Sequence, residues 1–146
     1  MSDKRLRLVY WTVTLLFAVL QGWAAVQYLT DAPRMAQTIA ALGYPLYFMK
    51  LLGVAKLLGI AAILFGRFPR LKEWAYAGFT FDTIAAFFSH IAAGDSLLIA
   101  SVPLLFCAAQ LASYFLWKKL EPTSEAAIHG WEKASPRIPP SRPRTA

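Results

Sequence analysis

The chain has 146 residues, of which 58% are hydrophobic and 16% charged, and its formal net charge is +7. This composition excludes an ordinary soluble domain, and the long apolar blocks exclude a porin-like barrel, so the sequence predicts an all-α membrane protein. The basic residues flank the apolar blocks, which argues against nucleic acid and makes the lipid bilayer the expected partner.

The first membrane span is predicted over residues 8–30, a stretch without a charged side chain. It exceeds the ~20 residues that cross ~30 Å of hydrocarbon. The basic residues before it resemble those of a signal peptide, but the apolar run is long and lacks a good cleavage site, so we expect an uncleaved anchor. Between Pro33 and Gly43 the apolar pattern is too short to span, and we expect a short interfacial helix there.

Three further apolar blocks are long enough to cross the membrane. We predict these spans over residues 47–66, 74–91 and 96–117. Together with the first span they predict a four-transmembrane-helix bundle, a single domain over residues 1–120. Residues 121–146 are rich in proline and lack apolar periodicity, so they are expected to form a disordered cytoplasmic tail.

Lysine and arginine are distributed unequally between the two sides of the predicted spans. One side holds Lys4, Arg5, Arg7, Arg67, Arg70, Lys72, Lys118 and Lys119, and the other holds Arg34 and Lys50. Because basic flanks stay in the cytoplasm, we predict a multi-pass protein of the inner (plasma) membrane with both termini cytoplasmic.

Lys56 and Asp82 are the most informative polar residues, since both fall near the middle of a predicted span. Each lies about ten or eleven residues from the basic side, or roughly 15–16 Å deep. A charge at that depth costs at least ~2.5 kcal/mol without a partner, so we expect an intramembrane pair, and Gly53 and Gly78 would let the helices approach. The pair could fix helix register, or it could relay protons or anchor a ligand, and the sequence leaves both interpretations open.

A second candidate set could form a ligand or proton site. It consists of Trp74, Tyr76, Ser89, His90 and Asp95. His90, with its two polar neighbours, could change charge near neutral pH, although a histidine at a helix end is more often only an interfacial residue. Trp74 and Tyr76 could stack on a quinone, although the aromatic belt at a membrane surface explains them more simply.

Motifs of soluble enzymes are missing from the sequence. It has no zinc ligand set, Walker loop, nucleophile elbow or dinucleotide fingerprint, so we assign no catalytic residue and no metal. The single cysteine, Cys107, excludes an intrachain disulfide and a cysteine-ligated cluster. Ligation of a haem by two histidines of one membrane domain is excluded, because that domain contains a single histidine, His90.

Several short motifs stand out along the chain. They are Leu42-Gly43-Tyr44-Pro45 with Tyr47-Phe48, Leu52-Gly53-x-x-Lys56-x-x-Gly59, Lys72-Glu73-Trp74-Ala75-Tyr76-Ala77-Gly78-Phe79 with Phe81-Asp82, and Ser89-His90 with Gly94-Asp95. Together they resemble the DoxX-like family of small bacterial membrane proteins, from about Val9 to Leu120. The resemblance implies a four-helix membrane bundle, and the wider family includes subunits linked to quinone-dependent sulfur oxidation and proteins tied to redox enzyme maturation.

Three classes of function are compatible with these features. The leading expectation is an accessory or partner subunit in membrane redox metabolism, with a quinone as the possible cofactor and a redox enzyme subunit or a second copy as the partner. A non-catalytic structural or assembly module needs only the bundle. A small carrier of protons or of a lipophilic solute ranks last, because carriers usually show internal repeats or broken helices and Pro103 is the only break within the spans. Whether the protein is itself catalytic stays open.

Overall fold

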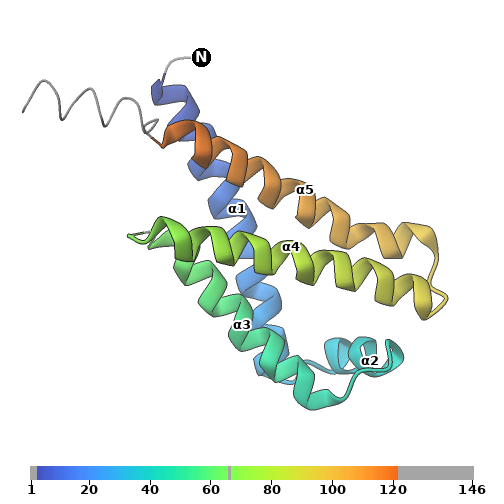
Figure 1. The fold of residues 1–146 in the computed structure, drawn as a ribbon. Coiled ribbons are helices and arrows are strands. Elements are labelled where there is room, and N and C mark those ends of the chain that lie inside the picture. The colour runs from blue at the N-terminus through green and yellow to red at the C-terminus, as the bar shows by residue number, and fades with distance from the viewer. Residues whose placement is uncertain (1–2, 66, 122–146) are drawn as a thin grey trace, which may run out of the picture.

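The structure is a computed structural model that describes residues 3–65 and 67–121, and this part of the chain is helical without any strand (Figure 1). Its helices are α1 (Asp3–Leu29), α2 (Pro33–Ala41), α3 (Leu46–Leu64), α4 (Pro69–Ala92) and α5 (Leu97–Leu120). The predicted all-α class is confirmed. The predicted tail, apart from Glu121, lies outside the described residues.

Local chemistry explains where several helices begin and end. Pro33 and Pro69 occupy first helical positions, where the missing N–H of proline costs nothing. The side chain of Ser96 caps α5 by accepting a hydrogen bond from the Ile99 amide. The turns after α2 and α4 need positive φ angles, and glycines with φ of 83° and 81° supply them.

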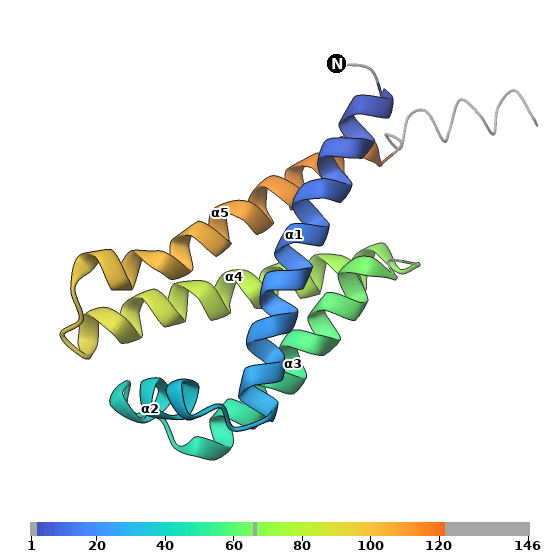
Figure 2. The ribbon, with the colours of Figure 1, turned by 180° about the vertical axis from the view of Figure 1, so that it is seen from behind.

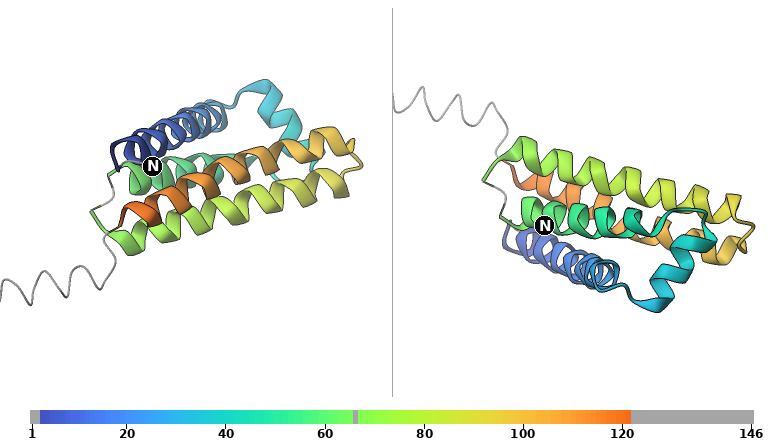
Figure 3. Two further views of the ribbon diagram at one scale, coloured as in Figure 1. Left: turned by 90° about the horizontal axis from the view of Figure 1, so that it is seen from above. Right: turned by 90° about the horizontal axis from the view of Figure 1, so that it is seen from below.

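The four long helices pack in a ring, with α1 against α3 and α5, and α4 against the same two helices. Figure 3 shows both ends of the described chain at one end of the molecule, which we call the terminal end. The α4–α5 turn and α2 lie at the other, which we call the loop end. Figures 1 and 2 show that the α1/α3 pair and the α4/α5 pair diverge toward the loop end, with α2 at the opening between them.

The packed core lies in the terminal half of the bundle. It is built from Tyr10, Phe17, Ile63, Tyr76, Phe79 and Trp117. Elsewhere the long helices expose large hydrophobic side chains around the outside of the ring, such as Leu98 on α5 at 81% exposure. Such a surface suits hydrocarbon rather than water. The close packing at one end leaves the loop half free to hold a cavity.

Three helices, α1, α3 and α5, are long and apolar enough to cross a membrane. The predicted third span corresponds to α4, which does not meet the same standard of apolarity. The predicted span, residues 74–91, contains one charged residue, Asp82, and polar residues that include Thr80, Thr83, Ser89 and His90, and together they lower its apolarity. The finding is therefore a multi-helix membrane protein with three clear spans, and the fourth span, over α4, stays a prediction.

Candidate functional site

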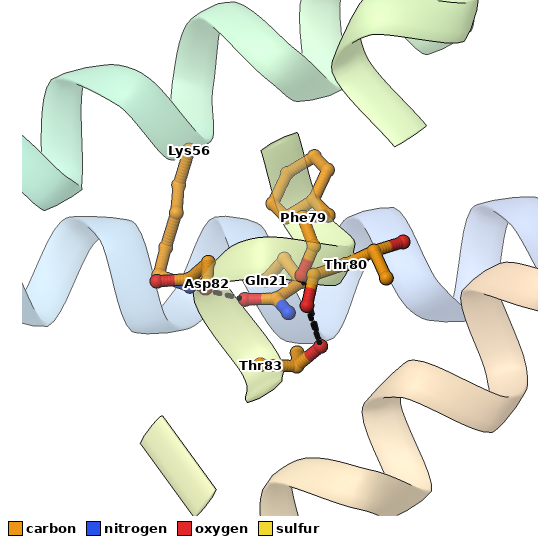
Figure 4. A network of polar contacts seen from close by, with 6 residues as sticks. All are labelled: Gln21, Lys56, Phe79, Thr80, Asp82 and Thr83. Carbon is orange, nitrogen blue, oxygen red and sulfur yellow. Dashed lines mark hydrogen bonds and ion pairs between the residues drawn. The ribbon is translucent and has the colours of Figure 1, made fainter. Parts of the chain in front are cut away.

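Lys56 and Asp82 face each other across the α3–α4 interface (Figure 4). Lys56 Nζ donates to Asp82 Oδ2 at 2.5 Å and to Gln21 Oε1 at 3.0 Å. The two charged side chains are 8% and 23% exposed. Three helices thus meet in one group of side chains, which we call the central polar cluster: Gln21, Lys56 and Asp82.

Aromatic rings complete the surroundings of the Lys56 ammonium. Its Nζ lies 5.8 Å from the ring centroid of Phe79 and 6.0 Å from that of Tyr28, which permits weak cation–π attraction. An ammonium has three N–H donors, and the described residues accept hydrogen bonds from two of them. One donor of Lys56 is therefore available to another acceptor.

Glycines on both sides of Lys56 let α3 approach its neighbours closely. A Cβ at Gly53 would lie 2.9 Å from Leu29 Cγ and 3.2 Å from the Ala25 carbonyl oxygen, so α1 and α3 can touch only because that side chain is absent. A Cβ at Gly59 would lie 2.7 Å from the ring of Phe79 on α4. The sequence predicted that Gly53 and Gly78 would let α3 and α4 approach, and both parts are wrong. Gly53 faces α1 instead of α4, and a Cβ at Gly78 would meet nothing within 4 Å.

A cavity of about 780 Å³ extends from the central polar cluster toward the loop end. Residues of all five helices line it, and its volume is in the range of small-molecule sites. Most of its lining is apolar. The polar or charged residues in its wall are Gln21, Tyr28, Arg34, Thr38, Tyr44, Lys56, Asp82, Thr83, Ser89 and His90.

A smaller hollow of about 300 Å³ lies between α3 and α4, and we call it the α3/α4 groove. Trp74 and Gly78 line it, and Trp74 is 77% exposed, so the groove reaches the outer surface of the bundle. Leu52, Lys56 and Asp82 line both the groove and the central cavity. These three side chains therefore form the partition between the two hollows.

The structure divides the second predicted set of residues among three places. Ser89 and His90 line the central cavity near the loop end, where Ser89 Oγ lies 2.8 Å from the Tyr44 hydroxyl. His90 Nδ1 lies 2.7 Å from Asp95 Oδ2, which holds the imidazole at the α4–α5 turn. Within the described residues, no group of three or more His, Cys, Asp or Glu side chains could hold a metal ion.

Trp74 and Tyr76 are separated from that end and from each other. Trp74 belongs to the α3/α4 groove. Tyr76 is 4% exposed and points into the terminal half, where its hydroxyl lies 2.7 Å from Ser113 Oγ. Tyr76 is therefore not among the residues that line the central cavity.

The sequence model of the DoxX-like family matches residues 12–113, which is more than half of the chain. The chain belongs to the DoxX-like family. The resemblance drawn from the sequence motifs is thereby confirmed. No curated protein and no solved structure matches the chain.

The family match begins within α1 and ends within α5. It therefore includes the central polar cluster and every residue that lines the central cavity. The first turns of α1 and the last turns of α5 lie outside the match, as does the chain beyond residue 121.

This DoxX-like protein also contains a buried polar cluster that the sequence analysis missed. Lys72 Nζ donates to the Tyr10 hydroxyl at 2.7 Å, and Lys72 is 5% exposed. Beside it, Ser113 Oγ lies 2.6 Å from Thr14 Oγ1 and 2.7 Å from the hydroxyl of Tyr76. Lys72 was counted as a basic flank. Lys72 lies four residues before Tyr76, and this spacing places the two side chains on the same face of a helix. It was the available signal that Lys72 points toward the interior.

Proposed function

We propose that this protein spans the inner membrane four times with both termini in the cytoplasm, binds a quinone-class molecule in its central cavity, and acts as an accessory subunit in membrane redox metabolism. The observation that carries the proposal is the cavity of about 780 Å³ with the Lys56–Asp82 ion pair in its wall. An apolar chamber with a few convergent polar groups is the usual form of a site for a lipophilic ligand.

The position of α4 supports a fourth span. Its 24 residues give a length of roughly 36 Å, enough to cross the hydrocarbon layer. It packs between α3 and α5 and exposes Trp74 and Phe88 at the surface of the bundle. Asp82 lowers the apolarity of α4, but its charge is compensated by Lys56. The excess of basic residues at the terminal end favours a cytoplasmic location for that end.

The chemistry of the cavity favours a ligand with carbonyl oxygens and an apolar body. The remaining N–H of Lys56 and the side-chain amide of Gln21 can both donate hydrogen bonds to a carbonyl. Asp82 balances the lysine charge, so the cluster as a whole does not select an anion. Apolar residues such as Phe48 and Phe106 line the remainder of the chamber and suit an isoprenoid chain.

The α3/α4 groove suggests how such a ligand would reach the cavity. A quinone is dissolved in the bilayer, and the groove is open to the outer surface of the bundle. Only the partition of Leu52, Lys56 and Asp82 separates the groove from the cavity. A ligand would therefore pass between α3 and α4 and would displace this partition on its way.

Binding is tested with the full chain purified in mild detergent, by mass spectrometry of extracted quinones and by titration with a short-chain ubiquinone. The Lys56→Met/Asp82→Asn double variant removes the charges without leaving one of them unpaired. We expect a loss of affinity of at least about tenfold, the value of one hydrogen bond to a charged group. Lys50→Met is the matched control, because Lys50 pairs with Asp31 and does not line the cavity.

Two results would overturn the proposal. One is a wild-type protein that neither retains a quinone nor binds one saturably. The other is an equal loss of affinity in the Lys50→Met control, since that would place the binding away from the cavity. The remaining functions would then be a carrier of protons or of another lipophilic solute, or a structural module.

A further inference from the structure

A third hollow, of about 440 Å³, lies at the terminal end, between the start of α1, the α3–α4 turn and the end of α5. We call it the terminal pocket. Three basic side chains line it: Arg7, Arg67 and Lys72. It shares no lining residue with the central cavity, so what binds in it is independent of the proposed quinone function.

Lys72 is the most unusual of these residues, because its ammonium is buried without a carboxylate partner among the described residues. The Tyr10 hydroxyl accepts one hydrogen bond from it. Its Nζ also lies 5.1 Å from the ring centroid of Tyr10 and 4.6 Å from that of Trp117. Aromatic rings and a hydroxyl compensate a buried cation only in part, so the pocket has unused affinity for an anion.

One carboxylate also lines the terminal pocket, but it is already engaged. Glu121 Oε2 accepts a hydrogen bond from Lys118 Nζ at 2.9 Å. Arg7 and Arg67 are both exposed at the rim, where their guanidinium groups can reach a bound oxyanion. Lys118 also pairs with Glu73, so it is shared between two carboxylates. The pocket itself offers three cations against the one carboxylate of Glu121.

The rest of the lining identifies the kind of anion. Trp11, Leu64, Phe65 and Leu120 add apolar surface beside the cations, and Phe65 is 79% exposed. A free phosphate has no apolar part that could contact this surface, whereas a phospholipid can pack its acyl chains against it. The pocket also lies at the ends of three apolar spans, where headgroups are found. We propose that the terminal pocket binds the phosphate headgroup of an anionic phospholipid.

The test is native mass spectrometry of the full chain in mild detergent, where a bilayer surface potential does not act. Wild-type protein is titrated with phosphatidylglycerol and, separately, with phosphatidylcholine. The Arg7→Gln/Arg67→Gln variant changes two exposed residues and leaves the buried Lys72 in place, so its fold is retained. We expect it to bind phosphatidylglycerol up to about 25-fold more weakly, or up to roughly fivefold for each exposed ion pair that is lost.

Arg5→Gln/Arg70→Gln is the matched control, with the same loss of charge from residues of α1 and α4 that do not line the pocket. It should change the affinity less than about threefold, because exposed charges outside the pocket are screened by solvent and salt. Inorganic phosphate at millimolar concentration should not displace the lipid.

Three outcomes would overturn the proposal. Equal weakening in both double variants would mean attraction by net charge alone. Equal affinities for phosphatidylcholine and phosphatidylglycerol would show that the pocket does not require a net negative charge on the lipid. Displacement by inorganic phosphate would assign the pocket to a free anion instead of a lipid.

Discussion

Lys56 Nζ lies 2.5 Å from Asp82 Oδ2, and this single contact belongs to the walls of both the central cavity and the α3/α4 groove. The two residues stand 26 positions apart on neighbouring antiparallel helices. Their contact therefore defines the register of α3 against α4. The contact also lies between the two hollows. The packing of α3 against α4 is therefore linked to the path by which a ligand would enter.

Breaking the pair from one side should cost more than removing both charges. Lys56→Met and Asp82→Asn should each lower the free energy of unfolding by about 3 kcal/mol, because each leaves a buried polar partner uncompensated. The double variant should be more stable than either single variant. Reversible unfolding in detergent, analysed as a double-mutant cycle, measures the coupling.

The exposed pair Lys50–Asp31 provides the comparison for this cycle, since its side chains are 44% and 63% exposed. Asp31→Asn, which leaves the hydrogen bond from Lys50 Nζ to the Leu29 carbonyl in place, should change stability by less than about 1 kcal/mol. A double variant of the buried pair that is no better than its single variants would contradict a direct pairing in the folded protein.

The sequence alone predicted that Lys56 and Asp82 would pair, but not which glycines of α3 and α4 lie at the contact between these helices. Hydropathy locates a span along the membrane normal, and it placed Lys56 and Asp82 at similar depths. The direction in which a side chain points depends on the rotation of its helix about the helix axis. Side chains of adjacent residues point in directions about 100° apart. For this reason Gly78 was expected at the helix contact but faces open space, while Gly59 occupies that contact.

Lys72 shows a second limit of the sequence. A lysine beside an apolar block normally extends into water or headgroups, so it was counted only as a cytoplasmic flank. In the structure Lys72 turns inward because Tyr10 and Trp117 provide a hydroxyl and an aromatic face at the helix ends. These partners come from helices distant in sequence. The spacing of Lys72 and Tyr76 indicates a shared helix face, but it does not identify these partners on other helices.

The close approach of α1 and α3 should be sensitive to one methyl group. In Gly53→Ala the new Cβ would lie 3.2 Å from the Ala25 carbonyl oxygen, a backbone atom that cannot move without shifting α1. We expect a loss of about 1–3 kcal/mol in unfolding free energy, as for other overpacked sites. Thermal unfolding in detergent measures the change.

Gly22→Ala is the matched control on the facing helix. Its Cβ would lie 3.8 Å from Ile60 Cδ1, an ordinary van der Waals distance. This variant should be neutral or more stable by up to about 1 kcal/mol, because alanine favours a helix over glycine. Equal destabilisation by the two substitutions would show that Gly53 does not form a special contact.

Ser113 should contribute more to stability than its size suggests, because its hydroxyl joins two other helices. Its Oγ lies within hydrogen-bond distance of both Thr14 on α1 and Tyr76 on α4. Ser113→Ala leaves the buried Tyr76 hydroxyl without this partner and should cost about 1–3 kcal/mol. Ser101→Ala on the same helix removes only a bond to the Leu98 carbonyl within α5 and should cost under about 1 kcal/mol. Chemical unfolding of both variants compares them.

Filling the α3/α4 groove should slow a ligand without changing how tightly it is held. A Cβ at Gly78 meets nothing within 4 Å and Gly78 lines the groove, so the ring in Gly78→Trp should lie in the groove. Because the central cavity is untouched, we expect association and dissociation of a short-chain ubiquinone both to slow by about tenfold, with Kd unchanged within threefold, as thermodynamic reversibility requires. Ala112→Trp, on the exposed face of α5, is the control and should leave both rates unaltered. Unchanged rates in Gly78→Trp would mean that the ligand reaches the cavity by another path, with the open loop end beside α2 as the alternative.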